Sequence, residues 1–186
     1  MTEKSRPKGT SPAANQARAR GRRAAAPIDP ARALVEAFLT NERINQVLLD
    51  LLEPRIWRLT PPCSKRRNIA TTFAHIHNVR CMYLRGTGSK APLENLERAT
   101  VTPAEARRAL AASARAMAEV LASACASGGK VRGVPLDAAA FLCSAITHEA
   151  HHRGQICHWA RELGAPLQDQ IQLWEWHKRQ REIASG

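Results

Sequence analysis

The sequence predicts an all-α protein built as a four-helix bundle, and three observations support this prediction. Apolar residues recur at spacings of three, four and seven along four long segments, which is the period of an amphipathic helix. Proline and glycine stand at the ends of these segments, where they start or stop helices. No segment alternates apolar and polar residues over a useful strand length. At about 1.5 Å per residue, the segments make rods of roughly 30 to 42 Å, the proportions of a bundle.

The first two helices are predicted over residues 30–53 and 65–85. Pro54 closes the first, Ser64 is the expected N-cap of the second, and Gly86 ends it. The periodic apolar positions of the first helix are Leu34, Phe38, Ile44, Val47, Leu48, Leu51 and Leu52.

The second pair of helices is predicted over residues 103–126 and 136–163, the latter ending before Gly164. Residues 87–102 show no sustained period and form a long crossover, so helices two and three are expected to run parallel. Residues 167–183 are expected to add a short packed tailpiece.

Charge and composition divide the 186-residue chain into a tail and one domain. The net charge is +12, and residues 1–27 hold seven basic residues and one acidic residue, or half of the surplus. This segment is rich in Ala, Pro, Ser and Gly and contains no aromatic residue, so we predict a disordered basic tail. Residues 28–186 are predicted to form the bundle domain. Nucleic acid is expected to bind at most non-specifically through the tail, because no base-reading motif is present.

The cysteines and the hydropathy pattern indicate the cellular compartment of the protein. Five cysteines, odd in number and without a C-x-x-C pair, are typical of reduced thiols in a reducing compartment. No apolar run approaches the ~18 residues of a membrane-spanning helix, and the tail lacks the apolar segment of a secretory signal. We therefore expect a soluble cytoplasmic protein without a membrane partner.

Two histidines in the fourth helix carry the most chemical information. His148 and His152 occupy positions where the apolar period expects leucine, one turn apart on one face. An inward pair without partners would leave buried polar groups at a cost of about 1 to 3 kcal/mol, whereas a metal ion would bind both. His151 lies 100° from His152 around the helix axis, on the outer side of the helix. The core-facing stripe of this helix consists of Phe141, Ala145, His148, His152, Ile156, Trp159 and Leu163.

A third ligand is expected from the second helix, which offers His75 and His77. These lie to either side of the apolar face centred on Ile76, and periodicity does not choose between them. Three imidazole nitrogens from two helices would leave coordination positions open for water or substrate, as in a catalytic metal site. Zn²⁺, Ni²⁺, Fe²⁺ and Mn²⁺ all accept imidazole ligands.

Several strings resemble one known family. The sequence H-E-A-H-H-R-G-Q-I at residues 148–156, followed by R-E-L-G-A-P at 161–166 and L-W-E-W at 173–176, is similar to the last helix and C-terminal segment of DinB/YfiT-like proteins. A-H-I at residues 74–76 resembles the other signature of that family. The resemblance covers residues 30–177.

This resemblance implies a four-helix bundle with a divalent metal held by His75, His148 and His152, and it favours His75 over His77. His77 would then have a structural or supporting role. Some members of the family resemble transferases or isomerases that use a low-molecular-weight thiol activated by the metal. A small-molecule substrate and a homodimer are expected by the same analogy.

Glu149 and Gln155 are candidate catalytic residues that would orient a ligand or move a proton. A Glu on a helix is, however, most often a solvated surface charge. We expect a metal-dependent enzyme, either a thiol transferase or a hydrolase-like enzyme. A metal-binding bundle without catalysis fits the same pattern.

A zinc protease is the rival interpretation of H-E-x-x-H. His158 stands where the longer pattern H-E-x-x-H-x-x-G-x-x-H places its third ligand. The glycine that this pattern requires is replaced by Gln155, with Gly154 one position early, and no methionine follows Met117 to form a Met-turn. These departures disfavour the protease.

Overall fold

The computed structural model describes residues 28–65 and 67–167, and this part of the chain forms four long helices without a β-strand. The all-α prediction is therefore confirmed. The four helices are α2 (Pro30–Leu51), α3 (Ile69–Gly86), α4 (Pro103–Ala126) and α5 (Ala138–Glu162). A short 3-10 helix, η1 (Pro54–Ile56), follows α2.

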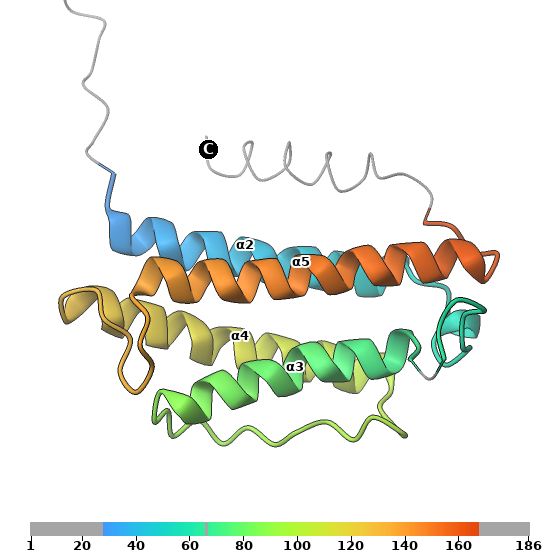
Figure 1. Ribbon diagram of the computed structural model, residues 1–186, viewed down its shortest axis with the longest axis horizontal. Helices are drawn as coiled ribbons and strands as arrows, with labels where there is room; N and C mark the ends of the chain where they lie inside the picture. Colours follow the sequence, from blue (N-terminus) through green and yellow to red (C-terminus); the bar gives the residue numbers. More distant parts are fainter. Residues whose placement is uncertain (1–27, 66, 168–186) are drawn as a thin grey trace, which may run out of the picture.

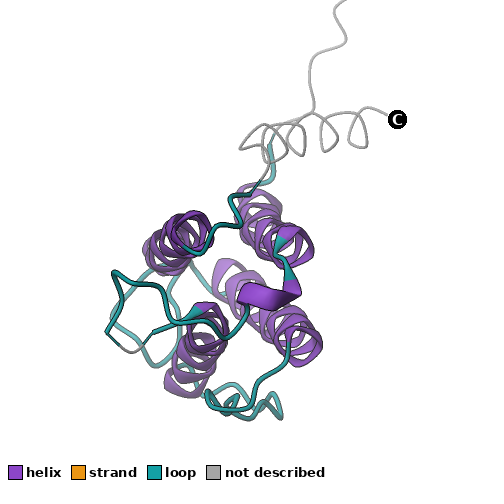
Figure 2. Ribbon diagram, turned by 90° about the vertical axis from the view of Figure 1, so that its right-hand side faces the viewer, coloured by secondary structure: helices purple, strands orange, loops and turns teal. Residues whose placement is uncertain are grey.

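The crossover between α3 and α4 determines the topology of the bundle. Residues 87–102 return along the length of α3, so that α3 and α4 run in the same direction, as expected from the sequence (Figure 1). α2 and α5 run together in the opposite direction. Viewed from the end, the four helices surround a common interior (Figure 2). This arrangement brings the inner faces of α3 and α5 together, although the two helices are far apart in sequence.

The helix starts follow from local capping, with one correction to the predicted bounds. α4 begins at Pro103, as predicted, after the N-cap Thr102, and Gly164 takes a φ of 69° just after α5. α3, in contrast, begins after Asn68 and not after Ser64. Asn68 Oδ1 accepts from the Thr71 backbone N–H at 2.9 Å, and Thr71 Oγ1 accepts from the Asn68 N–H at 3.0 Å. This reciprocal capping box satisfies two backbone donors at once, which the Ser64 hydroxyl alone does not do.

The inner face of α2 differs from the predicted apolar stripe. Phe38 and Leu48 are buried as expected, but the positions between them that face the interior are Asn41, Glu42 and Asn45. Three polar residues are therefore buried on a face where the apolar pattern placed only hydrophobic residues. Their partners, described below, lie on α3 and α5.

Two predicted segments fall wholly or almost wholly outside the described residues. These are the basic tail over residues 1–27 and the tailpiece over residues 167–183, of which only Leu167 is described. The domain boundary at residue 28 stays a prediction.

No apolar run approaches ~18 residues, but one helix among the described residues has the length and mean hydropathy of a membrane span. α4 is long and apolar enough by length and composition alone, with a window of mean hydropathy 1.3. Its many alanines produce this value, because alanine raises hydropathy while charged residues remain few. Leu110, Met117 and Leu121 of α4 are fully buried in the bundle, so the finding is weak evidence for a membrane span.

Candidate metal centre

Three histidines from two helices converge in the interior between α3 and α5. His75 Nε2 lies 3.2 Å from His148 Nε2, which in turn lies 3.1 Å from His152 Nε2. One nitrogen from each ring lies within 4.8 Å of the other two. His148 and His152 are one helical turn apart on α5, whereas His75 is placed by the packing of α3. The three residues could hold a metal ion.

Gln155 determines which nitrogen of His152 is available. His152 Nδ1 lies 2.8 Å from Gln155 Oε1, an acceptor, so Nδ1 carries the proton and donates it. The lone pair of His152 then lies on Nε2, which faces the other two rings. The structure therefore places the predicted residue Gln155 beside a candidate ligand, where its amide orients the imidazole in the manner of the hydrogen-bond partners of metal-bound histidines.

The spacing of the three nitrogens suits a metal ion. Ligand nitrogens about 2.0 to 2.1 Å from a tetrahedral metal are about 3.3 Å apart, close to the separations seen here. Two facing nitrogen lone pairs repel unless a proton or a cation lies between them. Because Nε2 of His152 has no proton, the cluster has fewer donors than its contacts require, and a cation between the rings would satisfy all three lone pairs.

The electrostatics of the cluster favour neutral imidazoles. The pKa of His75 is lowered to about 4, first by burial and then by the charges of His152 and His148. Burial is also the main cause that lowers the pKa of His148 and of His152, with further lowering from a neighbouring imidazole in each case. Near neutral pH all three rings are therefore neutral, and a neutral imidazole has one nitrogen with a free lone pair, as ligation requires.

A cavity of about 330 Å³ opens beside the cluster and gives a small molecule access to it. Two of the three histidines form part of its wall, together with polar and cationic residues from the start of α3 and from the crossover. Its lining residues are Arg67, Thr71, Thr72, His75, Arg98 and His152.

Glu149, the other candidate catalytic residue, is buried in an ion pair. Its side chain is 2% exposed, and both carboxylate oxygens accept hydrogen bonds from Arg80, at 2.7 Å from Nε and 2.7 Å from Nη2. Burial acts to raise the pKa of Glu149, and the charge and hydrogen bonds of Arg80 outweigh it, so the pKa is lowered. These contacts leave the carboxylate ionised and engaged, which favours a structural role next to His148. A role in proton transfer stays a prediction.

The buried residues of α2 complete this polar network. Asn41 and Asn45 each donate from Nδ2 to Glu149 Oε2, at 2.6 and 2.7 Å. Glu42 Oε2 lies 2.7 Å from Arg80 Nη2, so one guanidinium is paired with two carboxylates. Sequence reasoning missed this network. The available signal was that Asn41 and Asn45 are one turn apart on the same face as Phe38, where solvated residues are not expected.

His77 faces away from the three-histidine cluster. Its ring is 2% exposed, with Nδ1 3.2 Å from Ser113 Oγ of α4 and Nε2 2.9 Å from the backbone oxygen of Glu94 in the crossover. Burial is the main cause that lowers its pKa. The contacts show a histidine that ties α3 to α4 and to the crossover.

Two further histidines of α5 also lie outside the cluster. His151 is exposed, and its ring centroid lies 5.1 Å from that of His152. His158, the third ligand of the protease pattern, is exposed, with Nε2 3.6 Å from Cys63 Sγ. α5 continues as a helix through Gln155 to Glu162 without the turn that the protease pattern requires. The structure thus disfavours the protease site.

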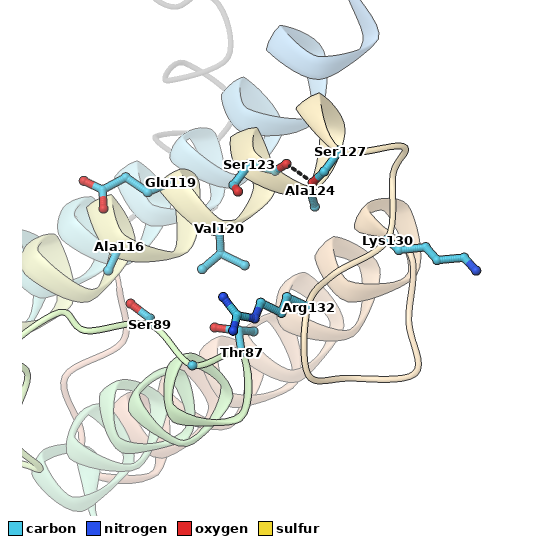
Figure 3. Close-up of a pocket in the computed structure, with 11 residues that line it drawn as sticks. Thr87, Ser89, Ala116, Glu119, Val120, Ser123, Ala124, Ser127, Lys130 and Arg132 are labelled. Atoms are coloured by element: carbon cyan, nitrogen blue, oxygen red, sulfur yellow. Dashed lines mark hydrogen bonds between the residues drawn. The ribbon is translucent and has the colours of Figure 1, made fainter.

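A second cavity, of about 240 Å³, lies toward the other end of the bundle (Figure 3). Thr87, in its wall, is about 18 Å from His75 along the α3 axis, taking about 1.5 Å per residue. Arg132 reaches from the loop between α4 and α5 toward Thr87, whereas Lys130 points away. None of the histidines is among the described residues that line it.

A helical bundle with three convergent imidazoles defines a class of candidate metal-binding proteins. The model of the DinB family matches residues 28–181, most of the chain, and the protein belongs to that family. The resemblance seen in the sequence is therefore confirmed. Neither a curated protein nor a solved structure matches the chain.

Proposed function

We propose that this DinB-family protein is a metal-dependent enzyme centred on His75, His148 and His152, and that it transfers a low-molecular-weight thiol to an electrophilic small molecule. The observation that carries the proposal is the convergence of three neutral Nε2 atoms at the edge of a cavity. A closed structural site would use four protein ligands, whereas three ligands next to a cavity leave room for a reacting molecule.

A divalent ion held by the three histidines would act as a Lewis acid and lower the pKa of a thiol or of water, supplying a nucleophile at neutral pH. The residues of the chain prepare the site for this chemistry. Gln155 holds His152 in the tautomer with a free Nε2, and burial keeps the three rings neutral. The ion pair of Glu149 with Arg80 anchors α5 at the residue next to His148.

The metal content of purified variants tests the first part of the proposal. Wild-type protein, the double variant His148→Ala, His152→Ala and the control His151→Ala are each incubated with Zn²⁺, Ni²⁺, Fe²⁺ or Mn²⁺, desalted and analysed for bound metal. His151 is a matched control because it lies on the same helix and is exposed. We expect one ion per chain in wild type and in His151→Ala and none in the double variant. Equal metal content in all three proteins would refute the site.

The transferase reaction is tested on metal-loaded protein with a panel of thiols and electrophiles. We expect the thiol and the electrophile to be consumed together by wild type and not by the double variant. Hydrolysis of the electrophile without loss of thiol would identify a hydrolase instead. A fully loaded protein that turns over no thiol and no electrophile would be a metal-binding bundle without catalysis.

A further inference from the structure

We infer that the cavity beside the three-histidine cluster binds an anionic ligand, with Arg67 and Arg98 recognising a carboxylate, sulfonate or phosphate group. This inference deepens the proposed function and rests on it, because it names the charge of the molecule that reaches the metal centre. The evidence is the position, pairing and anchoring of these two arginines.

Two unpaired positive charges face one cavity. Arg67 comes from the segment before α3 and Arg98 from the crossover, and both line the cavity. In the described part of the chain, neither guanidinium has a hydrogen-bond or ion-pair partner. No acidic side chain is among the described lining residues, so the protein supplies no counterion there.

The backbone on either side of Arg98 is held in place. The Leu96 N–H donates to Asn78 Oδ1 at 2.7 Å, and Asn78 Nδ2 donates back to the Leu96 oxygen at 3.1 Å. On the other side, Arg58 Nη1 donates to the oxygen of Ala99 at 2.7 Å. These hydrogen bonds hold the backbone that carries Arg98 beside the cavity, which reduces the entropy lost when a ligand binds.

The other polar groups of the cavity do not compete for an anion. The hydroxyls of Thr71 and Thr72 both donate to the backbone oxygen of Asn68, each at 3.0 Å. Their protons are therefore used within the first turn of α3. Arg67 and Arg98 remain as the charged donors that a ligand can reach, and a guanidinium binds a planar or tetrahedral oxyanion through two parallel hydrogen bonds.

Three thiols that share a 2-mercaptoethyl group and carry end groups of different charge test this inference. 2-Mercaptoethanesulfonate is an anion, 2-mercaptoethanol is neutral and cysteamine is a cation. Their dissociation constants for Co²⁺-loaded protein are measured from the thiolate-to-cobalt charge-transfer absorbance. We expect the sulfonate to bind about tenfold more tightly than the alcohol at low salt, the amine most weakly, and the preference to decrease with salt.

Variants locate the charge preference. In Arg67→Gln, Arg98→Gln the sulfonate and the alcohol are expected to bind within about twofold of each other, with cobalt content unchanged. Arg132→Gln, which removes the same charge from the second cavity, is the matched control and should keep the preference. A preference that is absent in wild type, that survives in the double variant, or that is lost in Arg132→Gln would overturn the inference.

A metal-free measurement separates failure of this inference from failure of the proposed function. Ethane-1,2-disulfonate, a dianion without a thiol, is titrated into metal-free protein while backbone amide resonances are followed by NMR. We expect shifts at Thr71, Thr72 and the residues around Arg98 in wild type, and their loss in the double arginine variant. Dianion binding without cobalt binding would refute the metal centre alone. Cobalt binding without any charge selectivity would refute the anion site alone.

Discussion

Replacing Arg80 by methionine removes the one cation that two buried carboxylates share. The Arg80 side chain is 1% exposed, and its Nη2 lies 2.7 Å from both Glu42 Oε2 and Glu149 Oε2. Burial acts to lower the pKa of Arg80, but the two carboxylates raise it above its ordinary value. The guanidinium is therefore charged at any pH at which the protein folds, and its removal leaves net negative charge in the interior.

The expected loss follows from the burial of all three groups. Removing one partner of a buried ion pair costs about 3 to 5 kcal/mol, because the remaining charge is desolvated without compensation. The carboxylates are 2% and 8% exposed, so solvent screening reduces this value little. Asn41 and Asn45 still donate to Glu149, and Arg153 Nη1 lies 4.0 Å from Glu149 Oε2, so these groups offset part of the cost. We expect a decrease of about 4 kcal/mol in the free energy of unfolding, out of the about 5 to 15 typical of a domain.

Urea unfolding of metal-free protein at pH 7 measures this decrease. The control is Arg85→Met, on the same helix, where the arginine is exposed and its closest hydrogen-bond contact is 3.4 Å. We expect a change below about 0.5 kcal/mol for the control. Arg80→Lys keeps the charge but not the paired hydrogen bonds, and should lie between wild type and methionine.

The pH dependence of the Arg80→Met variant gives an independent check. Without Arg80, burial raises the pKa of Glu149, so the folded variant binds protons that the unfolded chain does not. The Glu149 contribution to the stability of the variant then increases as the pH falls, whereas Glu149 in wild type has a lowered pKa and stays ionised. The three histidines act equally in both proteins, so their effect cancels in the difference. The difference between the two proteins should therefore decrease from pH 7 toward pH 5. A loss smaller than about 1 kcal/mol at pH 7, or one that grows on acidification, would refute the reasoning.

Three further predictions concern the metal centre. Gln155→Leu should weaken metal affinity about 10- to 100-fold, because Gln155 orients His152. Competition with a chromogenic chelator measures the affinity, and an unchanged value would contradict this prediction. A metal at about 100 times its dissociation constant should stabilise wild type by about 2.7 kcal/mol in thermal unfolding, and the effect should be absent in His152→Ala. The folded-state pKa values of His75, His148 and His152 are lowered from 6.5, to about 4 for His75, so the unfolded chain binds more protons between these values. Metal-free protein should hence be most stable above about pH 6.5 and lose stability as the pH falls toward 4. Urea unfolding at several pH values measures this change, and a free energy of unfolding that does not vary with pH would contradict the lowered pKa values.

Much of the fold could be predicted from local signals. The predicted range 103–126 agrees with α4, because its start depends on Thr102 and Pro103 and its end on the glycines that follow. The start of α3 was predicted about four residues early. Ser64 and Asn68 are both acceptable N-caps by residue type, and the choice depends on a side-chain partner, Thr71.

Helical periodicity predicted only part of the candidate metal centre. A spacing of four places His148 and His152 on one face of a helix wherever that helix packs. Periodicity did not distinguish His75 from His77, since each lies about 100° from Ile76. The resemblance to the DinB family favoured His75, and the packing of α3 against α5 brings that ring to the pair on α5 while His77 contacts α4.

The sequence by itself determined the helices, the pairing of two histidines one turn apart and the family, because each depends on residues near one another in the chain or on their order. Only the tertiary structure decided that His75 joins the pair, and that Glu149 is buried on Arg80 and two asparagines of α2. These contacts join residues 69 to 108 positions apart. A buried charge is stable only where its partners contact it, and these contacts depend on how the four helices pack.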